Sequence, residues 1–153
     1  MFVAGSRTKL GSMAKMSRGL RNLNPGNIRL GSFLYRGERA RSRDSAFRQF
    51  EAIEWGYRAM FVLLHTYAVK HHCRSLRDFV ARYAPPSENN TEAYLRRVAV
   101  STHIGPDEVI STTDGATMTV IVAAMSEVEN GVEAKMSDVC RGWELFVADF
   151  PEK

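Results

Sequence analysis

The acid with the clearest chemical setting lies at the end of a predicted helix. Residues 116–129 read ATMTVIVAAMSEVE, which is apolar nearly all round, and Asn130 with Gly131 ends the helix. The partly negative carbonyls of a helix C-terminus and an apolar environment both raise a carboxyl pKa, here that of Glu129. A carboxyl that keeps its proton near neutral pH can protonate a leaving oxygen, as cleavage of a glycosidic bond requires. The alternative is a solvated acid at a helix end.

A second group of residues could hold a sugar. The amide-rich loop, residues 21–31, reads RNLNPGNIRLG and contains Asn24 and Asn27. Amides and closely approaching glycine backbone suit N-acetyl groups, and Phe33, Tyr35 and Tyr83 could add flat aromatic surfaces. The alternative is an Asx-rich turn that only positions the next segment.

Positive charge is concentrated near the front of the chain. Between residues 18 and 48 there are eight arginines and only two acids, Glu38 and Asp44. Such a field favours a polyanionic partner, which could be nucleic acid, an anionic membrane or an anionic cell envelope. Glu38 is the competing catalytic acid, although nearby arginines favour its charged form and so argue against a proton donor.

Other chemistries have weaker support. His65 and His72 are seven residues apart and could share a helix face, but no carboxylate ligand accompanies them, so we expect no metal site. The chain has no GxSxG nucleophile motif and no phosphate-binding glycine loop. No cofactor is implied.

The elements that must position these residues are mainly helical. Apolar spacing predicts a helix from residue 53 to 72, a shorter one after a Ser75 cap, and others over 90–100, 116–129 and from 137 onward. Alternation in 33–37 and 46–50 predicts a small β-hairpin. The fold class is therefore α+β, with one domain over residues 17–150.

The first sixteen residues are expected to lie outside this domain. Residues 1–16 are rich in Gly, Ser and Lys and contain only a four-residue apolar patch, too short for a signal-peptide core. They are interpreted as a flexible leader or an appended tail. No stretch is long and apolar enough to span a bilayer.

Several motifs together resemble a known group of proteins. RGLRNLNPGNIR, FRQF, YAPPSENNTEAY and VENGV, in this order between about Arg18 and Trp143, are similar to phage and prophage proteins. These are virion-associated peptidoglycan-degrading enzymes, including the cystovirus lysis enzyme, and some members are described only as structural proteins. The group in turn resembles the lysozyme and lytic transglycosylase superfamily.

The resemblance implies a lysozyme-like domain with Glu129 as the catalytic acid. In that superfamily an apolar helix ends in the catalytic Glu, often followed by Asn, as Asn130 follows here. There the Glu helix precedes the β region, whereas here it lies in the C-terminal half, and no Glu precedes Glu38. We therefore expect a circular permutation. Leu23 stands where relatives often carry another Asn, a departure in the amide-rich loop.

The expected function is cleavage of the β-1,4 bond between N-acetylmuramic acid and N-acetylglucosamine in bacterial peptidoglycan. The expected substrate-binding residues are Asn24, Asn27, Tyr35, Tyr83 and Asn130. One alternative is a murein endopeptidase that cuts peptide cross-links. Another is a non-enzymatic virion or nucleic-acid-binding protein, although the paired aromatic platform of a single-strand binder is missing. The expected location is the virion or the bacterial periplasm and cell wall, with other virion proteins as further partners.

Overall fold

The chain folds mainly into helices. The computed structural model describes residues 16–151, so the predicted leader lies outside the described residues except for Met16. The helices of the described part are α2 (Arg18–Arg21), α3 (Ile53–His71), α4 (Leu76–Tyr83), α5 (Thr91–Thr102), α6 (Gly115–Asn130) and α7 (Met136–Asp149). The five longer helices confirm the sequence prediction to within two residues at most boundaries. The short helix α2 was not predicted.

Local capping chemistry sets several helix ends. Ser75 and Asp78 form a reciprocal capping box at the start of α4, as the Ser75 prediction required. The Asp114 side chain accepts the Thr117 backbone N–H at the start of α6. Gly131 ends α6 at φ 74°, a left-handed conformation that glycine adopts without a Cβ penalty. The length of α6, and with it the position of Glu129, is thus encoded locally.

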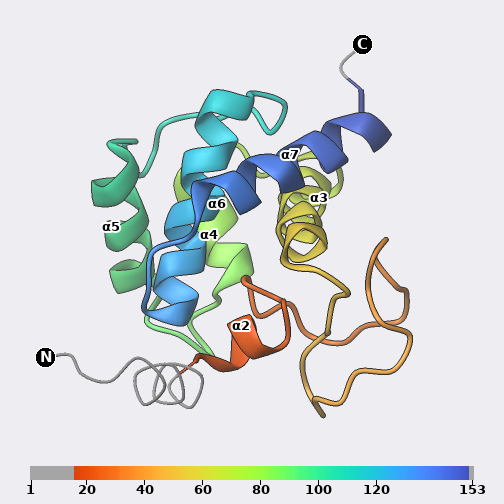
Figure 1. Cartoon of the computed structure of the whole chain (residues 1–153). Coiled ribbons are helices and arrows are strands. Elements are labelled where there is room, and N and C mark those ends of the chain that lie inside the picture. Colours follow the sequence, from red (N-terminus) through yellow and green to blue (C-terminus); the bar gives the residue numbers. More distant parts are fainter. Residues whose placement is uncertain (1–15, 152–153) are drawn as a thin grey trace, which may run out of the picture.

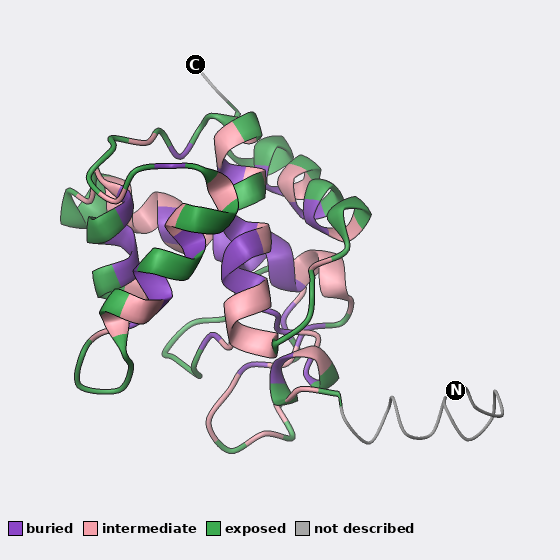
Figure 2. Cartoon of the chain, turned by 90° about the vertical axis from the view of Figure 1, so that its left-hand side faces the viewer, coloured by how far each residue is buried: buried purple, intermediate pink, exposed green. Residues whose placement is uncertain are grey.

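Helix α6 lies at the centre of the helical body (Figure 1). It contacts α2, α3, α5 and α7, and its Met118, Ile121, Val122 and Met125 side chains are at most 1% exposed. Figure 2 shows this burial along the middle of the body. The apolar helix is therefore largely buried, because neighbours on several sides cover most of it and leave only positions such as Val120 exposed.

Helix α7 packs closely along α3. A Cβ placed on Gly142 would lie 2.9 Å from the backbone nitrogen of Arg58 and 2.6 Å from the Tyr57 Cβ, so the two helices approach at this glycine. Phe146 and Val139 of α7 are buried in the same core. Other residues of α3, such as Val62 and Thr66, line the cleft described below.

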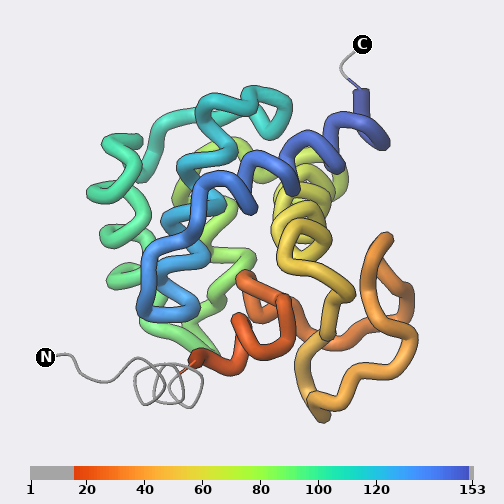
Figure 3. The backbone as a smooth tube through the Cα atoms, viewed as in Figure 1, coloured from red at the N-terminus to blue at the C-terminus, as the bar shows by residue number. Residues whose placement is uncertain are grey.

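The predicted hairpin is wrong in its pairing. The second segment, residues 46–51, pairs with residues 28–30 through the Arg29–Phe47 bridge and with residues 37–39 through the Glu38–Phe50 bridge. Residues 33–36 form no bridge. In Figure 3 the arginine-rich loop, residues 32–51, extends as an open tube beside the helical body.

A buried arginine explains why no regular strands form there. Arg48 is 3% exposed, and its guanidinium donates to the backbone carbonyls of Arg29 and Phe33 and to the Glu38 carboxylate. Carbonyls that would join a strand ladder are thus satisfied by a side chain. Alternation in sequence detected the half-buried segments, but the packing of Arg48 replaced the ladder.

Candidate active site

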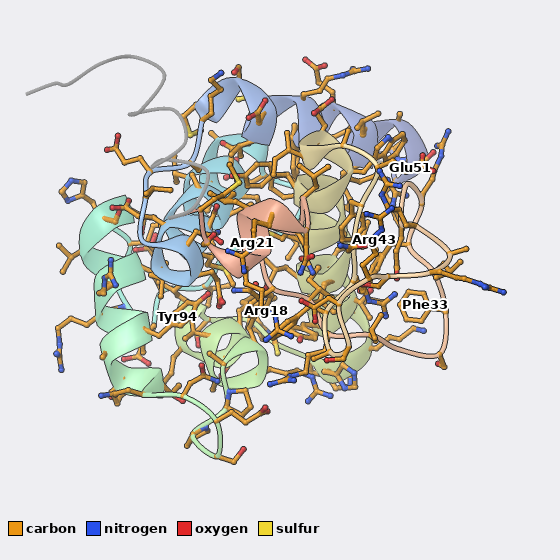
Figure 4. The ribbon with its side chains drawn as sticks, turned by 60° about the horizontal axis from the view of Figure 1, so that its bottom comes forward. Arg18, Arg21, Phe33, Arg43, Glu51 and Tyr94 are labelled. Carbon is orange, nitrogen blue, oxygen red and sulfur yellow. The ribbon has the colours of Figure 1, made fainter. Side chains whose placement is uncertain are left out.

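Glu129 lies in the last turn of α6, where two neutral side chains hold its carboxyl. The Asn27 Nδ2 donates to Oε1 at 2.9 Å, and the Tyr94 hydroxyl donates to Oε2 at 3.0 Å. Asn27 comes from the amide-rich loop and Tyr94 comes from α5. In Figure 4 the Tyr94 side chain points from α5 toward the body of the molecule. Segments separated by 102 residues in sequence therefore meet at one carboxyl.

The surroundings of Glu129 favour the protonated form. Burial raises the pKa of Glu129 above its ordinary value and outweighs the hydrogen bonds from Asn27 and Tyr94, which lower it. The last carbonyls of α6 act in the same direction as burial. No cation among residues 16–151 contributes to this balance. The carboxyl is thus set up to hold a proton and to release it to an acceptor in the adjoining space.

A cleft of about 900 Å³ adjoins this carboxyl. Glu129 lines it together with one side of α3 and parts of the amide-rich and arginine-rich loops. The remaining wall is the end of α4 and the connector that follows it. The contributing segments are residues 26–29, 33–36, 47–48, 58–71 and 82–89. A cleft of this size with polar and aromatic walls suits an extended, hydroxyl-rich ligand.

Tyr35 and Tyr83, both predicted to bind substrate, line this cleft. The Tyr83 hydroxyl donates to the Gly26 carbonyl at 2.5 Å, and a Cβ on Gly26 would collide with that hydroxyl. Tyr35 is 7% exposed and lies under the Arg48 guanidinium. Phe33, on the same loop, is 56% exposed and offers a more accessible ring.

Asn24 has a structural position instead of the predicted ligand contact. Its side chain is completely buried, donates to the carbonyls of Ile28 and Arg48, and accepts the Ile28 N–H. With its hydrogen-bonding groups used inside the protein, it cannot reach a ligand. Asn24 shapes the loop that carries Asn27.

Asn130 also acts within the protein, and it is not part of the cleft wall. Its Nδ2 donates to the carbonyls of Pro25 and Ser126, and its Oδ1 accepts from the Ser17 hydroxyl at 2.6 Å. These bonds tie the end of α6 to the amide-rich loop and to the start of α2. The predicted substrate role of Asn130 thus becomes one of holding Glu129 against the loop of Asn27.

Glu38 is buried away from the cleft wall in an ion pair. Its carboxylate lies 2.5 Å from Arg48 Nη1 and accepts the Tyr35 N–H, and its side chain is 2% exposed. Both of these contacts are made within the arginine-rich loop itself. The structure therefore places the competing acid in the framework of the arginine-rich loop.

Sequence reasoning missed Tyr94 as a site residue. Its spacing with Leu95 and Val98 indicated only a packing face of α5, and all three side chains are indeed buried. Its ring fills the core while the hydroxyl alone reaches Glu129. The single usable signal was the tyrosine that closes the YAPPSENNTEAY block.

Two further findings concern the described part of the chain. None of its helices is long and apolar enough to cross a membrane. Among residues 16–151, no three His, Cys, Asp or Glu side chains gather in an arrangement that could hold a metal ion. His65 instead bonds to Thr112, and His72 caps α3.

Comparison with known proteins gives a phage relative. The chain is 38% identical over 118 residues to protein P5 of Pseudoalteromonas phage PM2, which covers 75% of this chain and 72% of that protein. The chain belongs to the family of this phage protein. Membership of the P5 family supports the phage origin expected from the sequence motifs. No family model matches the chain.

Proposed function

We propose that the protein is a peptidoglycan-degrading glycosidase, a lysozyme or lytic transglycosylase, that uses Glu129 as its general acid. The observation that carries this proposal is the raised pKa of a partly buried carboxyl that faces a large cleft and is held only by neutral donors. This is the environment that keeps a carboxylic acid protonated near neutral pH.

The spatial order of the segments supports a permuted lysozyme-like domain. The end of α6 is joined by hydrogen bonds to Ser17 and to the Pro25 carbonyl, so the N-terminal loops continue in space from the Glu helix. The arginine-rich loop with its two bridges comes next, followed by α3, α4 and α5. In cyclic order this is Glu helix, small β region, then helices, with α7 as an addition.

In the proposed reaction, Glu129 donates its proton to the glycosidic oxygen as the bond to the sugar breaks. The positive charge that develops on the sugar then needs a partner. Glu88, the other acid at the cleft, is paired with Arg29, and Glu38 is paired with Arg48. We propose that the substrate supplies the partner, through its acetamido group or its 6-hydroxyl, in contrast to the two-carboxylate mechanism.

The residues around Glu129 would orient the acid. Asn27 and Tyr94 each occupy one carboxyl oxygen, which fixes the plane of the group toward the cleft. After proton transfer the same two donors stabilise the carboxylate that remains. Glu129 would then be able to take a proton back from water or from the sugar 6-hydroxyl, which completes either a hydrolysis or an anhydro-sugar product.

The arginine-rich surface would concentrate the enzyme on an anionic cell wall, an attraction that salt weakens. On this proposal the protein acts as part of a virion or after delivery to the periplasm and cell wall. Binding of nucleic acid is a weaker candidate, because the segment lacks the paired aromatic platform of a single-strand binder. Four of its eight arginines, Arg18, Arg29, Arg36 and Arg48, are paired with acids in the described chain, so the attraction to the cell wall would come from the other four.

The decisive experiment replaces Glu129 by Gln and follows the turbidity of purified peptidoglycan. We expect the rate to fall at least about 100-fold, the usual contribution of a general acid. Glu127→Gln is the matched control, because Glu127 lies about half a helical turn before Glu129 on α6 and does not line the cleft. Circular dichroism and melting confirm that both variants fold.

Analysis of the released fragments separates the candidate reactions. New reducing ends or anhydro sugar ends identify a glycosidase, whereas new free amines identify a murein endopeptidase. Salt-sensitive DNA binding without loss of turbidity would instead support a nucleic-acid-binding virion protein. If Glu129→Gln clears peptidoglycan at the wild-type rate, Glu129 is not the catalytic acid.

A further inference from the structure

The cations of the cleft fall into two groups according to their partners. Four of them are paired with acids within the protein: Arg29 with Glu88, Arg48 with Glu38, and both Arg36 and Arg58 with the single carboxylate of Asp149. Lys70 and Arg82 also line the cleft, but neither has an acid partner among residues 16–151. The lysine and arginine side chains of the cleft without a described acid partner therefore lie at the ends of α3 and α4.

Arg82 is held in place without an acid. Its Nη2 lies 3.1 Å from the His71 Nε2, and its guanidinium carbon lies 5.4 Å from the centre of the Tyr67 ring. Partial desolvation and the neighbouring Arg82 charge lower the pKa of His71, which favours the neutral ring that accepts this bond. The guanidinium is thus oriented while other N–H groups remain available for a ligand.

This basic end belongs to the same cleft as the candidate acid. Tyr83 follows Arg82 in α4, and its hydroxyl binds the Gly26 carbonyl next to Asn27, the residue that contacts Glu129. Burial, with the nearby charge of Glu129, raises the pKa of Tyr83. Glu129, Tyr83 and Arg82 therefore all line one cleft, so a ligand long enough to fill it would contact both the acid and the basic end.

We propose that Lys70 and Arg82 form a subsite for the carboxylates of the peptide stems carried by the glycan. This inference rests on the proposed glycosidase function and specifies its substrate as peptide-bearing glycan in preference to bare sugar chains. Where a stem is attached, the lactyl carboxyl group of N-acetylmuramic acid is used in the amide bond to the stem, so the glycan itself offers an unpaired cation no carboxylate there. Stem peptides carry carboxylates, which a planar guanidinium binds through two parallel hydrogen bonds.

The test compares three substrates made from one preparation of peptidoglycan from a wall without teichoic acid. The first is intact. The second has its stems removed by an amidase, and the lactyl carboxylates that this exposes are converted to amides. The third keeps its stems with their carboxylates converted to amides. The variant is Lys70→Gln/Arg82→Gln. The matched control is Arg74→Gln/Arg97→Gln, which removes the same charge from exposed arginines outside the cleft.

We expect the wild type to cut intact material faster than either modified substrate. The cleft variant is expected to be about five- to tenfold slower on intact material, a typical effect of losing charge-assisted hydrogen bonds, and unchanged on the other two. The control should match the wild type throughout. Equal losses on all three substrates, or no loss on intact material, would overturn the subsite. If the Arg74→Gln/Arg97→Gln control also cuts both intact and stem-free glycan more slowly, the cause is general charge attraction and not the subsite.

A binding measurement separates this inference from the proposed function. Glu129→Gln protein is sedimented with each insoluble substrate, with and without the Lys70 and Arg82 changes. Stem-dependent binding that the cleft changes abolish supports the subsite even if the wild type releases free amines instead of sugar ends. If Glu129→Gln protein binds intact and amidated material equally well with and without the Lys70 and Arg82 changes, the proposed subsite is wrong. The proposed glycosidase function would be unaffected by that result. Free phosphate, added up to the concentration of stem carboxylates, is expected to compete only weakly with peptidoglycan for the protein. Strong competition by phosphate would indicate a general anion site and would contradict a subsite for stem carboxylates.

Discussion

The arginine-rich loop buries a glutamate and the end of α6 partly buries another, but the two carboxyls have different kinds of partner. In the loop, Glu38 lies against the Arg48 guanidinium, which itself is almost fully buried and bonded to two backbone carbonyls. At the end of α6, Glu129 meets only an amide and a phenol. The first site is a buried ion pair within the loop, whereas the second leaves a carboxyl facing the cleft.

The difference shows that burial alone does not make a catalytic acid. A buried cation balances the charge of a buried carboxylate, while neutral donors leave the cost of burying charge largely uncompensated. Glu38 therefore suits a structural role and Glu129 a role in proton transfer. The following experiments test this contrast, from the largest expected effect to the smallest.

Exchanging each glutamate for glutamine should have opposite consequences at the two sites. Glu38→Gln leaves the Arg48 charge buried without its partner, which costs about 3 kcal/mol or more of unfolding free energy. Glu129→Gln removes a carboxyl whose charged form is disfavoured by burial, so we expect equal or higher stability near neutral pH. Urea unfolding of both variants measures these changes.

Activity should follow the reverse pattern. Below its unfolding transition, Glu38→Gln protein should retain substantial clearing of peptidoglycan, whereas Glu129→Gln should not. A stable but inactive Glu38→Gln variant would mean that the acid roles are assigned the wrong way round.

The two asparagines of the amide-rich loop extend the comparison. Asn24→Ala should lower the unfolding free energy by about 2 kcal/mol, because two buried carbonyls and one buried N–H lose their partner. Asn27→Gly keeps the positive φ of 49° accessible and removes the donor to Glu129. We expect it to reduce activity more than stability. Denaturant curves beside turbidity assays distinguish the two effects, and similar profiles for both variants would contradict the separation of roles.

Tyr94→Phe should produce the smallest change, a shift of the pH profile. The Tyr94 hydroxyl stabilises charged Glu129, so its removal raises the pKa of Glu129 further. A general acid is active while protonated, and the alkaline limb of the rate profile should therefore move to higher pH. Rates measured across pH with Tyr57→Phe as the control test this, because Tyr57 bonds to Ser126 and not to Glu129.

The raised pKa of Glu129 also makes the unfolding free energy depend on pH. Glu129 has a folded pKa above its unfolded value, so wild-type stability falls as pH rises from the ordinary glutamate range through the raised pKa. Tyr94→Phe should extend this decline to higher pH, and Glu129→Gln should abolish it. The assigned hydrogen bond would be contradicted if the alkaline limb of the Tyr94→Phe rate profile moved to lower pH. It would also be contradicted if Tyr57→Phe shifted that limb by the same amount.

Local signals predicted the helices because their determinants lie close together in the chain. Ser75 and Gly131 act on residues within a turn of themselves, and the apolar spacing of α6 needs no knowledge of its neighbours. The β-hairpin failed because its pairing depends on Arg48, which bonds to carbonyls 15 and 19 residues away. Alternation of apolar residues cannot reveal where a buried guanidinium will take the backbone acceptors.

The sequence by itself determined that an apolar helix ends in Glu129 and that an amide-rich loop and an arginine-rich segment precede the other helices. It could not determine which amides would face a ligand, since Asn24 and Asn27 are chemically identical and only packing buried the first. Tertiary structure also brought Tyr94 to Glu129 and Arg48 to Glu38. A carboxyl's affinity for its proton is set by the few groups within hydrogen-bond reach, and those groups come from segments that only folding brings together.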